Sequence, residues 1–252
     1  MLLAIDSSAG ASVAVIHDGQ ILASWRTAET NTHAEVLASA VQRALAEAGV
    51  GGPELEGVVV GVGPGPFTGL RVGLALAHSL AEVWRKPLHG ICSLDSLALR
   101  AAAQGLTGEF LAASDARRRE IYWAQYRVQS HETSGSASAA GNSPVAGSGP
   151  AVSSGPAAGS GPAVSLQDLN GPHVSAAAEA PALPALGAGV GLYADQMQLA
   201  EGLPGGADQW LPDAEELAQL ADSGAAQLRE PLPLYLRESD AKVPQQMKRA
   251  GA

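Results

Sequence analysis

Short apolar runs open the chain and predict β-strands. They cover residues 2–5, 11–16 and 21–25 and are separated by Ser, Gly and Asp, which interrupt regular structure. The Asp18-Gly19 pair between the last two runs is typical of a tight hairpin turn. We therefore expect three consecutive antiparallel strands at the start of the fold.

A helical pattern replaces the strand pattern after these runs. Leu37, Val41 and Leu45 share one face of a helix that Thr32 would cap and Gly49 would close. The elements expected next are a strand at 57–62, a helix at 68–84, a strand at 88–91 and a helix opened by Ser93. The resulting order, βββαβαβα, is typical of the ribonuclease-H-like half-domain on which actin-like kinases and chaperones are built.

Between about residues 129 and 165 the chain consists almost entirely of Ser, Gly, Ala and Pro. A six-residue unit recurs there, beginning at Ser148, Ser154 and Ser160. Such a segment buries too little apolar surface to offset the conformational entropy that ordering would cost. We therefore expect a disordered insertion rather than a stacked repeat, because the unit lacks the large residues that a repeat core needs.

The insertion interrupts a second, reduced half-domain. The elements expected around it are strands at 110–114, 121–128 and 182–186, a glycine-rich turn at 187–191, a helix from Tyr193 and a helix capped by Asp213. The chain is thus predicted to be an α/β protein with an actin-like ATPase (ASKHA) fold of two ribonuclease-H-like subdomains. We place these subdomains at 1–105 and 106–237, followed by a polar tail at 238–252.

Composition and charge narrow the classes of function. No apolar run approaches the roughly 18 residues needed to span a bilayer, and the start of the chain lacks the pattern of a secretory signal. Cys92 is the only cysteine and excludes an intrachain disulfide, so we expect a cytoplasmic protein. The formal net charge of -10 argues against autonomous binding to nucleic acid, since such binding depends on Lys and Arg. The one basic cluster, Arg117 to Arg119, is the kind of run that usually forms a solvated turn.

The most informative segment is the glycine-rich stretch from Gly61 to Gly73, which leaves a predicted strand and enters a predicted helix. It is not a P-loop, because no Lys-Ser/Thr pair follows the glycines, and its spacing does not fit a dinucleotide fingerprint. The chemistry alone leaves two interpretations open, a plain tight turn and a site for a ligand or partner.

Four segments of the chain resemble one known family. The stretch from Gly63 to Gly73 resembles the GPGSFTGxRxG signature of the TsaB and TsaD proteins, with Pro66 in place of the usual Ser. Residues 4–8 resemble the AIDTS opening, residues 93–97 resemble SSLEAL, and residues 115–123 resemble the DARRGEVYW segment of TsaB proteins. The chain is therefore identified as similar to the TsaB (YeaZ) family over about its first 128 residues, with a weaker match in the C-terminal half.

This resemblance implies a subunit rather than an enzyme. TsaB proteins are non-catalytic subunits of the machinery that makes threonylcarbamoyladenosine in ANN-decoding tRNAs, and they dimerise with and activate the catalytic subunit TsaD. The partners expected are TsaD, the ATPase subunit TsaE, and tRNA only through the complex. No cofactor is expected on this chain, because ATP would be bound by the complex or by its other subunits.

The same resemblance bears on metal and nucleotide chemistry. TsaD carries two metal-binding histidines at positions i and i+4 of its first long helix, whereas here His33 is followed by Leu37, so no metal site is expected. Asp6, Ser7 and Ser8 stand where actin-like ATPases contact a nucleotide, and they are the candidates for a nucleotide loop. We expect Asp6 to be a turn-capping residue, with a stand-alone actin-fold ATPase or carbamoyl-transfer enzyme as the alternative function.

The predicted helix at 68–84 is apolar almost all round, which indicates burial on two sides. One side would face the sheet of its own subdomain, and the other would face either a partner or the second subdomain. The pattern leaves a TsaD heterodimer and a homodimer equally open, since related partners bury similar surfaces. The residues predicted to contact a partner are Phe67, Thr68, Leu70, Arg71, Gly73, Leu74, Ala77 and His78, with Leu37 and Val41 from the first helix.

Overall fold

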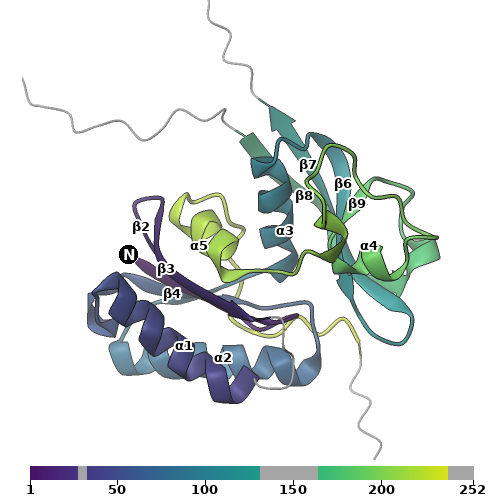
Figure 1. Ribbon diagram of the computed structural model, residues 1–252. Helices are drawn as coiled ribbons and strands as arrows, with labels where there is room; N and C mark the ends of the chain where they lie inside the picture. Colours follow the sequence, from purple (N-terminus) through teal and green to yellow (C-terminus); the bar gives the residue numbers. More distant parts are fainter. Residues whose placement is uncertain (28–32, 131–163, 238–252) are drawn as a thin grey trace, which may run out of the picture.

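The computed structural model of the chain describes residues 1–27, 33–130 and 164–237. These residues form two β-sheets with helices packed on and between them (Figure 1). In this described part, none of the helices has both the length and the apolar character that crossing a membrane requires.

The first sheet has five strands in the order β3-β2-β1-β4-β5. The three N-terminal strands pair antiparallel, and β1–β4 and β4–β5 pair in parallel, as the sequence pattern predicted. The strands are β1 (Leu2–Asp6), β2 (Ala11–His17), β3 (Gln20–Thr27), β4 (Gly57–Gly61) and β5 (Leu88–Ile91).

Helices cover both faces of this sheet. On one face lie α1 (His33–Ala48) and α2 (Phe67–Trp84), and on the other lies α5 (Ala214–Asp222) (Figure 1). Alternate residues of each strand point to opposite faces, so Leu3 and Ile5 pack under α1 and α2 while Ala4 packs under α5. The helix α5 thus completes the core of the N-terminal half, although it comes from far along the chain.

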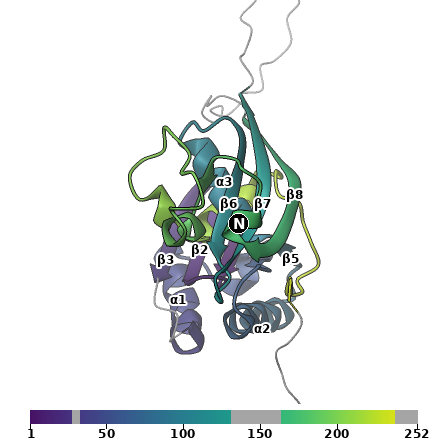
Figure 2. The same ribbon diagram turned by 90° about the vertical axis from the view of Figure 1, so that its right-hand side faces the viewer.

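The second sheet has four strands in the order β8-β7-β6-β9. The expected hairpin β6–β7 is antiparallel, β8 is added antiparallel to β7, and β9 is parallel to β6. Between the two sheets lies α3 (Ser93–Ala103), which packs on both α5 and the second sheet (Figures 1 and 2). The strands are β6 (Gly108–Asp115), β7 (Glu120–Ser130), β8 (Val164–Ala176) and β9 (Ala185–Leu186).

The predicted insertion at about 129–165 overlaps ordered strands at both ends, which is a correction to the sequence analysis. The strand β7 continues to Ser130 and β8 begins at Val164, whereas folded sequence had been expected to resume only near Ala182. The strand β8 lies at the edge of the sheet and pairs through its backbone, so it needs few apolar side chains and gives a weak sequence signal. Residues 131–163 lie outside the described part.

The glycine-rich stretch after β9 is a helix, not the predicted turn. The helix α4 (Ala188–Leu192) begins after Gly187 and ends before Tyr193, where the sequence pattern had placed a helix start. A Cβ atom at Gly189 would lie 2.9 Å from the Cβ of Ala113 in β6. These glycines therefore let a short helix lie close against the second sheet. The predicted cap of α5 is confirmed, since the Asp213 side chain accepts a hydrogen bond from the backbone N–H of Glu215.

Candidate functional site

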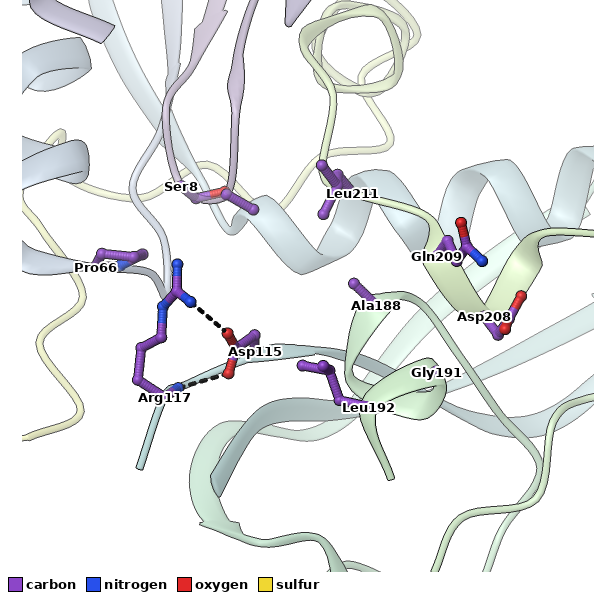
Figure 3. A pocket seen from close by; sticks show the side chains of 11 residues that line it. Ser8, Pro66, Asp115, Arg117, Ala188, Gly191, Leu192, Asp208, Gln209 and Leu211 are labelled. Atoms are coloured by element: carbon purple, nitrogen blue, oxygen red, sulfur yellow. Dashed lines mark hydrogen bonds and ion pairs between the residues drawn. The ribbon is translucent and has the colours of Figure 1, made fainter. Parts of the chain in front are cut away.

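A cavity of about 420 Å³ lies where the two halves of the molecule meet (Figure 3). The N-terminal half contributes the end of the β1–β2 turn and the residue before α2, and the C-terminal half contributes the end of β6, α4 and the segment before α5. Its lining is Ser8, Ala9, Pro66, Asp115, Arg117, Ala188, Gly191, Leu192, Asp208, Gln209 and Leu211.

The charged groups of the cavity include an internally paired set at the end of β6. The Asp115 carboxylate accepts a hydrogen bond of 2.7 Å from the backbone N–H of Arg117 and forms an ion pair of 3.3 Å with the guanidinium of the same residue. The Arg117 side chain extends from there toward Ser8 and Pro66 of the N-terminal half (Figure 3). Through this pair, the β6–β7 turn forms part of the cavity wall.

Asp6 stands at the end of β1 but does not line the cavity. Its carboxylate is 1% exposed and accepts hydrogen bonds from the backbone N–H and the hydroxyl of Ser8, at 2.8 and 2.7 Å, and from the hydroxyl of Ser93, at 2.5 Å. Burial raises the pKa of Asp6, while the hydrogen bonds from Ser93 and Ser8 act in the opposite direction. The bond from the Ser8 N–H closes an Asx turn, so one oxygen of Asp6 holds this turn and the other binds the Ser93 hydroxyl at the start of α3.

Ser7 is used in the same internal way. Its hydroxyl donates to the carbonyl of Gly69 and accepts from the backbone N–H of Gly73, which fixes the first turns of α2 against β1. A Cβ atom at Gly73 would lie 2.3 Å from the Ser7 hydroxyl, so this position requires glycine. The structure thus brings the three nucleotide-loop candidates together, and of the three Ser8 alone lines the cavity.

The predicted partner residues on α1 and α2 divide into two groups. Phe67, Thr68, Arg71 and His78 are exposed. Six others lie in the core of the chain itself, because the apolar stripe of α2 is covered by the first sheet and by α1. A partner that docks on the folded chain would contact the outer surface instead. The six buried residues are Leu37, Val41, Leu70, Gly73, Leu74 and Ala77.

The exposed start of α2 is joined to the C-terminal segment, which sequence reasoning missed. The rings of Phe67 and Tyr235 stack at 4.9 Å, the guanidinium of Arg71 lies 3.6 Å from the Phe67 ring centre, and the Arg71 Nε–H donates to the Tyr235 hydroxyl at 2.8 Å. The Nε2 of His78 is 2.8 Å from the carbonyl oxygen of Pro231. The only sequence signal near this contact is the weaker resemblance in the C-terminal half, which includes residues 233–237.

Comparison with known proteins finds similarity to proteins of threonylcarbamoyladenosine biosynthesis. The family model described as "TsaD: tRNA N6-adenosine threonylcarbamoyltransferase" matches residues 26–150. An uncharacterised protein of Mycobacterium leprae is 46% identical over 132 residues, which is 50% of this chain and 35% of that protein. The tRNA threonylcarbamoyladenosine biosynthesis protein TsaB of Escherichia coli is 35% identical over 127 residues, which is 50% of this chain and 54% of that protein. The chain therefore spans only about a third to a half of the length of these two curated relatives.

A solved structure extends the similarity beyond these segments. YeaZ from Pseudomonas aeruginosa superposes with a TM-score of 0.66 and 27% sequence identity, covering 93% of this chain and 99% of that structure. The family-model match covers residues 26–150, whereas the structural match covers 93% of the chain and so includes the second sheet as well. The chain is thus similar in sequence to TsaB over about half of its length and similar in structure to YeaZ over most of its length.

Proposed function

We propose that this chain is a non-catalytic subunit that binds and activates TsaD in the biosynthesis of threonylcarbamoyladenosine in tRNA. The observation that carries the proposal is the agreement between the TsaB sequence matches over about half of the chain and the YeaZ structural match over 93% of it. A cytoplasmic location fits this role.

The outer surface of α1 and α2 is the proposed contact with TsaD. Phe67 at the start of α2 is 43% exposed and Val83 near its end is 76% exposed, so both ends of the helix present apolar surface. Small exposed residues lie between and beside them, and these would let a partner helix approach closely. They are Ala75 and Ser79 of α2 and Ala38, Ser39 and Ala46 of α1.

The use of the polar residues near the cavity favours a subunit over a stand-alone enzyme. The Asp6 carboxylate and the Ser7 hydroxyl hold β1, α2 and α3 together through hydrogen bonds within the chain. A group engaged in this way would have to break these contacts before it could orient a metal ion or a phosphate. We therefore assign the transfer chemistry to TsaD and the ATPase chemistry to TsaE.

A reconstituted modification assay tests the proposal. TsaD, TsaE, tRNA and the threonylcarbamoyl donor would be incubated with and without this chain, and modified adenosine would be measured. We expect modification only when the chain is present together with TsaD. Modification by the chain and donor without TsaD, or metal-dependent ATP turnover by the pure chain, would instead support the enzyme alternative.

A pair of substitutions tests the proposed surface. Ala75→Arg places a large cation on the outer face of α2, and binding of TsaD should then weaken by at least about 100-fold because the charge would be desolvated without a partner. Ala103→Arg, at the exposed end of α3, is the matched control and should bind normally. Unchanged binding by Ala75→Arg would refute the surface. Light scattering of the chain alone would show whether the same surface forms a homodimer.

A further inference from the structure

The turn between β6 and β7 contains three consecutive arginines with a left-handed backbone. The φ angles of Arg117, Arg118 and Arg119 are 61°, 55° and 66°. Residues with a Cβ atom adopt this conformation at a cost, and a run of three is unusual. Strain of this kind persists where the surrounding structure enforces it, and it is concentrated at functional sites. We refer to Arg117–Arg119 as the arginine turn.

Contacts on both sides hold the arginine turn in place. On one side, Asp115 binds the backbone N–H and the guanidinium of Arg117. On the other side, Arg237 forms an ion pair with Glu120 and donates a 2.9 Å hydrogen bond to the carbonyl of Ala116. The C-terminal segment therefore fixes the base of the turn.

The local charge is opposite to that of the whole chain. Four arginines, Arg117, Arg118, Arg119 and Arg237, stand against the two carboxylates Asp115 and Glu120, which gives the region a formal charge of +2 in a chain of net charge -10. All three residues of the turn are exposed. Guanidinium groups match the geometry of phosphate oxygens and stay charged at every physiological pH.

The arginine turn lies beside the surface proposed for TsaD. Arg117 and Pro66 line the same cavity, and Pro66 is the residue directly before α2 (Figure 3). A partner that covered the start of α2 would therefore lie close to the turn, together with any RNA bound at that edge. This placement removes the objection that an acidic chain cannot attract RNA alone, because the partner would supply most of the affinity.

We propose that the arginine turn binds phosphate groups of the tRNA while the tRNA is held in the complex with TsaD. This inference rests on the proposed function. It assigns a direct RNA contact to a chain whose overall charge had predicted none. An acidic surface of a protein partner is the competing occupant, and the experiment below separates the two.

The test compares three variants in the reconstituted complex. Arg118→Ala/Arg119→Ala removes two charges, Arg118→Lys/Arg119→Lys retains them, and Arg85→Ala is the control. Arg85 is also an exposed arginine with a left-handed backbone, with φ 56°, but it lies at the end of α2, outside the arginine turn. Affinity for tRNA would be measured by filter binding at several salt concentrations, and assembly with TsaD by size-exclusion chromatography.

For the alanine variant we expect assembly to be unchanged and tRNA binding to become weaker and less dependent on salt. Each phosphate contact contributes about 0.7 to 0.9 to the slope of log affinity against log salt, so two lost contacts should reduce the slope by roughly 1.4 to 1.8. At 0.1 M salt this corresponds to about 5- to 8-fold weaker binding per arginine removed. The lysine variant should keep the slope, and Arg85→Ala should keep both slope and affinity.

Two outcomes overturn the proposal: an unchanged slope in the alanine variant, or a loss of TsaD assembly without a change in slope, which would indicate a protein contact. Failure of the unmodified chain to assemble with TsaD would refute the proposed function instead. In that case the isolated chain would be titrated with the same tRNA at about 20 mM salt, where charge interactions are weakly screened. The alanine variant must then bind more weakly than Arg85→Ala, and equal binding also overturns the inference.

Discussion

Arg119 is a residue at which backbone conformation and side chain conflict. Its φ of 66° disfavours any residue with a Cβ atom, and the related TsaB segment DARRGEVYW has glycine at this place. We expect Arg119→Gly to raise the free energy of unfolding by about 1 kcal/mol, after allowance for the greater freedom of glycine in the unfolded chain. Urea unfolding measures this. Arg43→Gly, inside α1, is the control and should lower stability by about 1 kcal/mol. A destabilised Arg119→Gly would contradict the assignment of strain.

Asp95 is a buried carboxyl that makes stability depend on pH. It is 7% exposed, accepts a 2.7 Å hydrogen bond from the Tyr126 hydroxyl, and lies near Asp168 and Arg229. Burial raises its pKa from 3.8 to about 6, so folding favours the protonated form. This contribution is fully present below the unfolded pKa and is lost as pH rises through about 6.

Asp95→Asn tests this dependence, since asparagine keeps an acceptor for Tyr126 and cannot ionise. Between pH 4 and 7, the free energy of unfolding of the unmodified chain should fall by up to roughly 3 kcal/mol because of this residue alone. The difference in unfolding free energy between the two proteins should therefore shift in favour of the variant as pH rises. A difference that stays constant over this range would exclude the assignment.

At the residue scale, the sequence predicted local contacts and missed distant ones. The cap formed by Asp213 joins residues two positions apart, so its pattern is visible in the chain. The contacts of Tyr126 with Asp95 and of Tyr235 with Phe67 join residues 31 and 168 positions apart, respectively. Such pairs depend on the final packing of the sheets, and a single sequence contains no signal for them.

At the element scale, α2 gives the sharpest contrast between a buried and an exposed face. Leu74 is 5% exposed within the N-terminal core, whereas its neighbour Ala75 is exposed. We expect Leu74→Arg to unfold the chain or destabilise it by more than about 3 kcal/mol, because an unpaired charge would be buried. Ala75→Arg should leave the circular dichroism spectrum and the melting temperature nearly unchanged. Equal stability of the two variants would refute the packing of this helix.

The predictability of an element followed the strength of its apolar pattern. The strands β1 to β5 and the helices α1 to α3 were predicted because each buries a regular stripe or run. The strand β8 was missed because an edge strand is held by backbone pairing to β7. The helix α4 was mistaken for a turn because its glycines serve close packing on β6, and composition alone does not separate these two uses.

At the scale of the whole molecule, the two halves are linked by segments from the C-terminal part of the chain. Arg100 of α3 donates two hydrogen bonds to Glu216 of α5, and Arg26 of β3 pairs with Asp213 at 3.0 Å. The helix α5 thereby lies between the first sheet and α3. The cavity and the arginine turn both depend on this arrangement, since each combines residues from distant parts of the sequence. The order of elements was predictable, but this linkage was not.

The long segment 131–163 provides a test at the same scale. Ser130 and Val164 are cross-strand partners at the end of the β7–β8 ladder, so a two-residue turn can connect them. We expect replacement of 131–163 by Asn-Gly to keep the fold and to leave stability unchanged or up to about 2 kcal/mol higher, because each halving of a loop lowers its closure cost by about 0.6 kcal/mol. Replacement by a Gly-Ser linker of the original length is the control, and it should match the unmodified chain. Melting temperature and TsaD-dependent modification of tRNA would be measured for both.

A fall in melting temperature of more than about 5 °C in the short variant, beyond any fall in the control, would mean that the segment stabilises the second sheet. A loss of modification in both variants at normal stability would instead assign the segment a role in the complex.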